Sequence, residues 1–194
     1  MDSSEEQLYL VKIKGGDSAP FSFLVDKYKY MAYTIALKIL DNSEDAEDVA
    51  QESFIKAYQQ IHQFEGKSKF STWLYTIVYR TAISRLKDTR IETLPISDKI
   101  KENYTQDYTT ALDRLEEKDE QRYVKQAIQK LPKTEALLIT LFYINENSIR
   151  EIQEITGLSS ANIKIKLFRA RKKLERELHF LLEHDLKASE ENAK

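Results

Sequence analysis

Apolar residues recur at helical spacing along the first half of the chain, and this pattern predicts four helices. The first covers Glu5 to Lys14 and ends at a pair of glycines, which commonly stop helices. The second begins near Pro20 and carries an apolar stripe of Phe21, Leu24, Tyr28, Met31, Ile35 and Ile39. The third extends from Ser43, a good N-cap residue, to Ile61, and the fourth from Phe70 to Lys87.

The helical pattern dissolves after Asp88 and returns near Ala111. It continues to about Asp185, with a division at Leu131-Pro132 and a tight turn at Gly157. The stretch without a sustained period is interpreted as a linker. The chain is therefore predicted to be all-α, with two small helical domains joined by a flexible acidic linker. The predicted boundaries are 1–90 for the first domain, 91–112 for the linker, 113–185 for the second domain and 186–194 for a polar, frayed tail.

The composition agrees with helices and excludes several kinds of site. The 194 residues include only 4 Gly and 3 Pro, and the absence of Cys excludes disulfides and thiolate metal sites. The N-terminus lacks the basic and apolar regions of a secretory signal. No apolar stretch reaches the roughly 18 residues that a membrane span needs. We expect a cytoplasmic protein without direct membrane insertion.

The net charge of −2 conceals an uneven distribution of charge. Residues 65–90 contain six basic and two acidic side chains, and residues 159–176 contain seven basic and one acidic. Residues 92–120, between them, contain nine acidic and four basic side chains. Two basic patches beside an acidic connector suit local contacts with phosphates, although basic helix faces also occur in proteins that bind no nucleic acid.

The third predicted helix has an acidic side opposite its apolar stripe. The stripe contains Ala46, Val49, Ala50, Phe54, Ala57, Tyr58 and Ile61. The acidic side contains Asp45, Asp48 and Glu52, and Ile55 projects among them. An apolar residue within an acidic stripe suits a basic protein partner. The alternative is a solvated acidic face with one stray isoleucine.

The fourth predicted helix and the loop before it combine hydroxyls, an aromatic ring and cations. The predicted buried stripe contains Phe70, Trp73, Leu74, Ile77 and Val78, and packing is the expected main role of Trp73. The loop and the outer side of the helix supply Lys67, Ser68, Lys69, Thr72, Thr76, Tyr79, Arg80, Ile83 and Lys87. Such a surface suits single-stranded DNA, because cations bind phosphates and aromatic faces hold unstacked bases. An ordinary amphipathic helix is the alternative.

The second predicted domain contains the pattern of a helix-turn-helix. A short helix over 149–155 is followed by the turn Thr156-Gly157-Leu158 and by a basic helix that Ser159 or Ser160 can cap. The basic helix is predicted to bury Ile163, Leu167, Ala170 and Leu174 and to expose Asn162, Lys164, Ile165, Lys166, Phe168, Arg169 and Lys172. In a major groove, Asn162 suits a base edge, Ile165 a thymine methyl and the cations phosphates. An αα-hairpin with a charged outer face is the alternative.

Three segments, in this order, resemble the extracytoplasmic-function (ECF) group of the sigma-70 family of bacterial transcription initiation factors. Residues 45–54, DAEDVAQESF, resemble the polymerase-binding helix of that family. Residues 70–77, FSTWLYTI, resemble its strand-opening and −10 recognition segment. Five further segments resemble its −35-binding domain: Leu131-Pro132, Glu151-Ile152, Gly157-Leu158-Ser159, Ile163-Lys164 and residues 167–174, LFRARKKL.

The resemblance implies a sigma factor and not an enzyme, with no cofactor, no metal and no small-molecule substrate. The implied partners are core RNA polymerase, through its β′ clamp helices and β flap, promoter DNA and an anti-sigma factor, which is often membrane-anchored. The acidic linker would lie along the RNA exit path of the polymerase. The implied core-binding residues are Asp45, Asp48, Gln51, Glu52 and Ile55.

The implied DNA contacts divide between the two domains. Those at the −10 element are Lys67, Ser68, Lys69, Thr72, Thr76, Tyr79, Arg80 and Lys87. Those at the −35 element are Ser160, Asn162, Lys164, Ile165, Lys166, Arg169 and Lys172. The chain departs from the family at Tyr79-Arg80 and Ser84, where Arg-Asn and then Asp are frequent, and at Ala161-Asn162, where Gly-Thr is frequent. These positions lie on or beside the DNA faces, so we expect an individual promoter preference.

Two other classes of function stay open at the level of sequence. A helix-turn-helix repressor or response regulator would need a receiver or ligand domain, and the first 90 residues show neither alternating strands nor a pocket signature. An enzyme would need a catalytic pattern, but His62, His179 and His184 are scattered, and no HExxH, GxxxxGK[ST] or GxSxG motif occurs.

Overall fold

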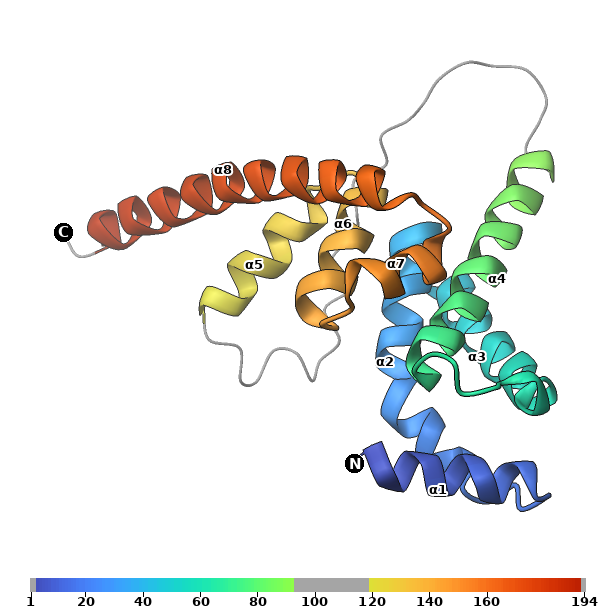
Figure 1. The fold of residues 1–194 in the computed structure, drawn as a ribbon. Coiled ribbons are helices and arrows are strands. Elements are labelled where there is room, and N and C mark those ends of the chain that lie inside the picture. The colour runs from blue at the N-terminus through green and yellow to red at the C-terminus, as the bar shows by residue number, and fades with distance from the viewer. Residues whose placement is uncertain (1–2, 93–118, 193–194) are drawn as a thin grey trace. The chain divides into compact units, whose positions relative to one another are not determined.

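The computed structural model describes residues 3–92 and 119–192, and every regular element within these ranges is a helix (Figure 1). This confirms the all-α prediction. The described residues belong to two compact units. The first contains α1 (Ser3–Lys14), α2 (Phe21–Leu40), α3 (Ser43–Gln59), the short η1 (Ile61–Gln63), α4 (Phe70–Glu92) and most of α7 (Ile149–Thr156). The second contains α5 (Asp119–Gln129), α6 (Lys133–Ile139), η3 (Thr140–Ile144) and α8 (Ser160–Asn192). Residues 93–112 of the predicted linker lie outside the described residues.

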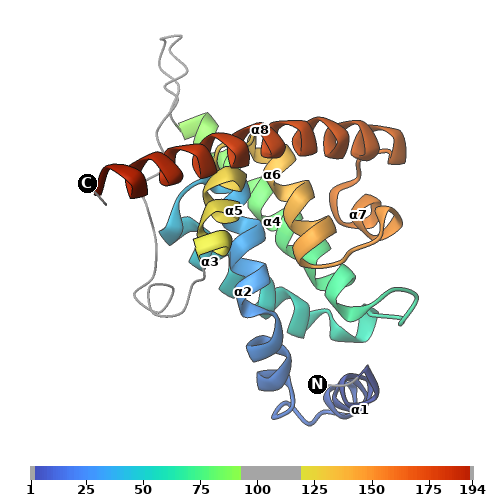
Figure 2. The ribbon, with the colours of Figure 1, turned by 90° about the vertical axis from the view of Figure 1, so that its left-hand side faces the viewer.

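The core of the first unit lies where α2, α3 and α4 pack against one another (Figure 2). Five fully buried alanines on these helices let the backbones approach closely: Ala32, Ala36, Ala46, Ala57 and Ala82. Larger side chains such as Leu24, Ile35 and Leu74 fill the remaining space and are also fully buried. Helix α1 lies against α2 and η1, where it buries Leu10 and Ile13.

The start of α3 differs by one residue from the sequence prediction. Asn42, not Ser43, is the N-cap, because its backbone is extended (φ −140°, ψ 127°) whereas Ser43 is already helical. The Asn42 side chain accepts a hydrogen bond from the backbone N–H of Asp45 at 3.0 Å. Glu44 and Asp45 lie in the first turn, where the helix dipole favours negative charge.

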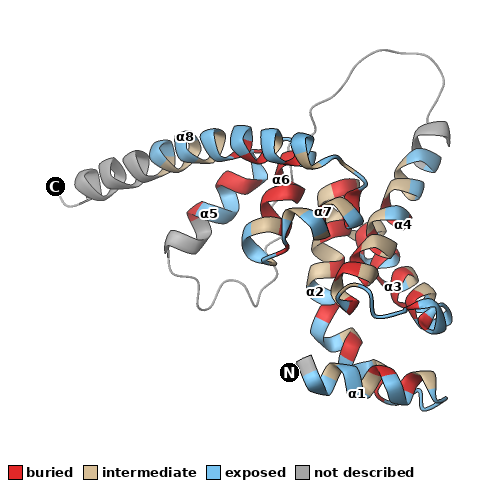
Figure 3. Ribbon diagram, viewed as in Figure 1, coloured by how far each residue is buried: buried red, intermediate tan, exposed pale blue. Residues whose placement is uncertain are grey.

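The second unit is built from α5, α6 and α8, each of which contacts the other two. Pro132 stands at the N-cap position of α6, so the predicted division at Leu131-Pro132 is confirmed. All five residues from Glu135 to Ile139 are buried, as the red ribbon of α6 in Figure 3 shows. The buried carboxylate of Glu135 pairs with Lys173 of α8 at 2.8 Å, which satisfies its charge inside the unit.

Some predicted boundaries and buried positions are wrong. Helix α4 continues to Glu92, and α8 continues to Asn192 through the expected frayed tail, where Lys, Ala and Glu favour helix. Tyr58 is 41% exposed and not part of the core, because it lies in the last turn of α3 with its ring edge-on to Phe21 at 5.1 Å. Ile61 is buried, but it belongs to η1 and not to α3.

Candidate protein and nucleic-acid interfaces

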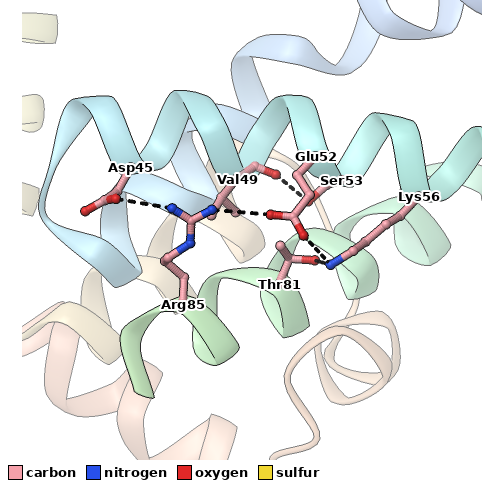
Figure 4. A network of polar contacts seen from close by, with 7 residues as sticks. All are labelled: Asp45, Val49, Glu52, Ser53, Lys56, Thr81 and Arg85. Atoms are coloured by element: carbon pink, nitrogen blue, oxygen red, sulfur yellow. Dashed lines mark hydrogen bonds and ion pairs between the residues drawn. The ribbon is translucent and has the colours of Figure 1, made fainter. Parts of the chain in front are cut away.

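The acidic side of α3 faces an arginine from α4 (Figure 4). The Arg85 guanidinium lies between two turns of α3, with one terminal nitrogen 3.5 Å from Asp45 and the other 3.5 Å from Glu52. Lys56 pairs with Glu52 at 2.7 Å and also donates to the hydroxyl of Thr81 at 3.3 Å. The hydrogen bond from Lys56, together with the charges of Lys56 and Arg85, lowers the pKa of Glu52.

This network divides the predicted acidic stripe into two parts. Asp48 and Gln51 are exposed, and Ile55 is 58% exposed, as the sequence predicted. Asp45 and Glu52 are only half-exposed, because both carboxylates lie beside Arg85. Asp45 and Glu52 thus lie opposite the buried stripe of α3, as predicted, but their carboxylates pair with Arg85 of α4, which the sequence did not predict. A partner approaching α3 meets Asp48, Gln51 and Ile55 first.

The segment 65–69, which we call the basic loop, joins η1 to α4. It turns at Gly66, whose φ of 73° favours glycine. Lys67 and Lys69 are exposed and Ser68 is half-buried, as a binding loop requires. Lys67 pairs with Glu65 of the same loop, and Lys69 pairs with Glu151 of α7 at 2.9 Å. Both cations are thus held by carboxylates that a phosphate would have to replace.

The outer side of α4 carries most of the predicted DNA contacts, with one exception. Arg80 and Lys87 are exposed, and Thr76 and Tyr79 are half-buried. Thr72 is only 1% exposed, so the prediction that it faces outward is wrong. Its hydroxyl lies 3.5 Å from the carboxylate of Glu151, within the same compact unit. Burial also raises the pKa of the Tyr79 phenol.

The buried side of α4 holds an aromatic cluster that the sequence predicted only in part. Phe70 is 1% exposed and its ring centroid lies 5.7 Å from that of Trp73. Phe64, which precedes the basic loop, lies 5.6 Å from Phe70 and 5.3 Å from Trp73. Trp73 is half-buried and packs in this cluster, as the sequence predicted.

The helix-turn-helix elements follow one another along the chain as predicted. Helix α7 ends at Thr156, Gly157 turns with a φ of 73°, and α8 begins at Ser160. Of the two candidate caps, Ser159 is the one used: its hydroxyl accepts a hydrogen bond from the backbone N–H of Asn162 at 3.3 Å. Because the backbone of Asn162 makes this contact, the cap does not occupy its side-chain amide.

The predicted faces of α8 are largely confirmed. Ile163, Leu167 and Ala170 are buried, whereas Leu174 is only half-buried. Asn162, Lys164, Ile165, Arg169 and Lys172 are exposed, and Ser160 and Lys166 are half-buried. Sequence reasoning gave no role to Phe168, yet it is 56% exposed on the same side and Lys172 lies over its ring at 4.8 Å. The sequence already placed this aromatic residue on the exposed side of the helix, and that position could have marked it as a candidate contact.

The described residues contain neither a metal-binding arrangement nor a membrane span. Within 3–92 and 119–192, no three His, Cys, Asp or Glu side chains are grouped so that they could hold a metal ion. No helix in that part of the chain is both long and apolar enough to cross a membrane.

Comparison with known proteins decides between the functions left open by the sequence. The family model for sigma-70 region 2 matches residues 24–91, and that for sigma-70 region 4 matches residues 121–174. The ECF RNA polymerase sigma factor SigW of Bacillus subtilis is 33% identical over 177 residues, which cover 88% of this chain and 95% of SigW. The chain belongs to the ECF sigma factors. The RNA polymerase sigma-H factor of Pseudomonas aeruginosa is 30% identical over 190 residues, covering 94% of this chain and 98% of that protein.

Solved structures show the same fold. The sigma factor RpoE of Bartonella quintana, in complex with the anti-sigma factor NepR, is similar with a TM-score of 0.60 at 20% identity, covering 82% of this chain and 96% of that chain. CnrH in complex with the cytosolic domain of CnrY is similar with a TM-score of 0.57 at 20% identity, and the match covers 92% of this chain and 97% of that chain.

As an ECF sigma factor, the protein is a transcription initiation factor of a family that binds core RNA polymerase and promoter DNA. This confirms the predicted family and function and excludes the repressor, since region 2 matches the half of the chain that a repressor would use for a receiver or ligand domain. The region 2 match covers nearly all of α2 and includes α3 and most of α4, and the region 4 match covers most of α5 and the first part of α8. Helix α1 lies outside both matches.

Proposed function

We propose that this sigma factor docks on core polymerase through α3 and contacts the promoter through α4 and α8. The supporting observation is that one chain combines an exposed acidic helix face with two exposed basic surfaces, each within a matched sigma region. Asp48, Gln51 and Ile55 form the centre of the core-binding face, and Asp45 and Glu52 form its edge beside Arg85. The β′ clamp helices are the proposed partner of this face, and the β flap that of the second domain.

The melted −10 strand is proposed to lie along the basic loop and the outer side of α4. Lys67, Lys69, Arg80 and Lys87 bind phosphates in this proposal, since all four are exposed. The bases are contacted by Ser68, Thr76 and Tyr79, which are half-buried and supply hydroxyl groups and, in Tyr79, an aromatic ring. Thr72 becomes a contact only where Glu151 moves away, because its side chain is buried in the described structure.

The −35 element is proposed to receive the first turns of α8 in its major groove. Asn162 reads a base edge and Ile165 contacts a thymine methyl, since both are exposed near the start of the helix. Lys164, Lys166, Arg169 and Lys172 bind phosphates, and Ser160 contacts the DNA at the start of the helix.

We also propose that the protein acts without catalytic activity, in the cytoplasm, and under the control of an anti-sigma factor. The similar folds of RpoE, solved with the anti-sigma factor NepR, and of CnrH, solved with the cytosolic domain of CnrY, support such a partner. Cell fractionation before induction distinguishes a membrane-anchored anti-sigma factor from a freely diffusing one. The proposed domain boundaries are 1–90, 91–112 and 113–185.

Run-off transcription with core polymerase on a randomised promoter library tests the proposed function. We expect the chain to enrich templates that share one −10 sequence and one −35 sequence at a fixed spacing. The proposal would be contradicted if initiation were the same with and without the chain. It would also be contradicted if only a −10 sequence were enriched and variants of α8 initiated transcription like the wild type.

A further inference from the structure

Helix α1, which lies outside the region 2 match, contacts Phe64, the residue directly before the basic loop. The Lys14 ammonium group, in the last turn of α1, donates a hydrogen bond to the backbone carbonyl of Phe64. The same group lies over the Phe64 ring at 5.5 Å from its centroid. Lys14 thus binds both the backbone and the side chain of the residue that directly precedes the loop.

A second chain of contacts leads from α1 to Phe70, the residue directly after the loop. The Glu6 carboxylate accepts a hydrogen bond from the Tyr28 hydroxyl and pairs with Lys27 at 2.5 Å. The Tyr28 ring lies 5.8 Å from the ring of Phe70, which directly follows the loop and begins α4. Burial, and then the hydrogen bond and charge of Glu6, raise the pKa of Tyr28.

The two ends of the loop therefore meet in one buried cluster. Phe64 is 7% exposed and Phe70 is 1% exposed, and their ring centroids are 5.6 Å apart. Between these fixed ends, Lys67 and Lys69 remain exposed. Helix α1 is itself held by its buried Leu10 and Ile13, so the contacts of Glu6 and Lys14 are made from a fixed position.

We propose that α1 is a positioning element for the basic loop, with Lys14 holding its start and Glu6, through Tyr28, holding its end. A loop whose ends are already fixed loses less conformational freedom when it binds a strand, and its affinity rises accordingly. Lys14 is a positioning residue here and does not contact DNA. The inference rests on the proposed role of the basic loop at the melted −10 strand.

The experiment uses the full chain assembled with core polymerase. Lys14→Met removes the donor and keeps the apolar stem over Phe64. Lys12→Met is the matched control, because Lys12 lies exposed in the same last turn of α1 and its replacement changes the charge equally. We measure the affinity for core polymerase and the affinity of each holoenzyme for a fluorescent single-stranded oligonucleotide with the −10 non-template sequence, at several salt concentrations.

Losing one hydrogen bond predicts about 3- to 10-fold weaker oligonucleotide binding for Lys14→Met, with core affinity unchanged and Lys12→Met like the wild type. The salt dependence separates positioning from direct contact. A lysine that bound a phosphate would lower the salt slope by about 0.7 when removed, whereas a positioning lysine leaves the slope unchanged. Lys14→Arg, which can still donate to the Phe64 carbonyl, should restore binding.

Equal oligonucleotide affinities for Lys14→Met and Lys12→Met would overturn the proposal, and so would a loss accompanied by the lower salt slope. If Lys14→Met fails to fold, Tyr28→Phe tests the proposal instead, because it keeps the ring on Phe70 and removes only the hydroxyl. Normal oligonucleotide binding by Tyr28→Phe would then overturn the proposal. The double variant Lys67→Ala/Lys69→Ala separates the two hypotheses. If it binds the oligonucleotide normally, the proposed −10 role of the loop fails; if it binds weakly while Lys14→Met binds normally, only the positioning role fails.

Discussion

Charge reversal at Asp48 and at Glu52, which lie one helical turn apart on α3, should change the stability of the fold to different extents. Asp48 is exposed, so Asp48→Lys should change the free energy of unfolding by no more than about 0.5 kcal/mol and should weaken binding to core polymerase. Glu52 pairs with Lys56 at 2.7 Å and lies 3.5 Å from Arg85. Glu52→Lys therefore loses two half-exposed ion pairs and places a third cation between two others.

The size of the Glu52 effect follows from these contacts. An exposed i,i+4 pair contributes about 0.3–0.5 kcal/mol, and other exposed pairs about 0.2–1 kcal/mol. Like charges at the same spacing are destabilising by similar amounts. Together these values give a loss of about 1–2 kcal/mol for Glu52→Lys, or roughly 5–10 °C in the melting temperature of a domain of this size.

The pH dependence of this loss has a defined sign. The pKa of Glu52 is lowered in the folded state, so its stabilising contribution is fully present above the unfolded-state pKa of about 4.3. The contribution disappears as the pH falls through the lower folded-state pKa. The stability difference between the wild type and Glu52→Gln should therefore shrink in acid.

Thermal and urea unfolding, together with titration against labelled core polymerase, measure both effects. Glu5→Lys, an equal charge change at an exposed position of α1, is the control for non-specific electrostatics. If Glu52→Lys is as stable as Asp48→Lys, the network of Figure 4 does not contribute to stability. If folded Asp48→Lys binds core polymerase like Glu5→Lys does, α3 is not the docking helix.

Three further predictions concern the DNA faces and one turn. Replacing Lys67, Lys69, Tyr79 and Arg80 by Ala should reduce open-complex formation more than it reduces holoenzyme assembly. Open complexes are measured by permanganate footprinting, and an equal loss of both steps would indicate a folding defect. Asn162→Ala should lose roughly 1–3 kcal/mol of binding free energy on the preferred −35 site and little on variants of that site at one base pair. Replacing Lys166, Arg169 or Lys172 by Ala should instead weaken binding to all −35 sequences alike, and each replacement should lower the salt slope of duplex binding by about 0.9. A uniform loss for Asn162→Ala would leave it without a base-reading role. Glu146 has a φ of 53°, so Glu146→Gly should raise the free energy of unfolding by about 0.5–1 kcal/mol, and an unchanged value in urea unfolding would mean that the turn is not strained.

Helical periodicity predicted the faces of single helices well. It correctly predicted that Ile55 on α3 is exposed and that Ile163, Leu167 and Ala170 on α8 are buried, because each assignment depends only on neighbours along one helix. It did not place Arg85 beside Asp45, since the pairing of two helices is not encoded in the period of either one. The burial of Thr72 has the same cause: the residue that lies beside it, Glu151, is 79 positions away in the chain.

Helix ends were harder to predict than helix faces. Asn42 and Ser43 are adjacent and both suit an N-cap, so sequence alone could not separate them. Helix α4 passes Lys87 because no Gly or Pro follows before Pro95, and α8 passes Asp185 for the same reason. The sequence also gave no signal that α1 reaches the basic loop, since Lys14 and Phe64 are 50 residues apart.

This sigma factor is expected to read a promoter only as part of the polymerase holoenzyme. A gel-shift experiment with one promoter duplex, in the presence and absence of core polymerase, tests this expectation most directly. We predict no specific complex with the chain alone and a stable, heparin-resistant complex when core polymerase is added. Tight, sequence-specific binding of the duplex by the chain alone, with the same affinity in the presence of core polymerase, would contradict the account.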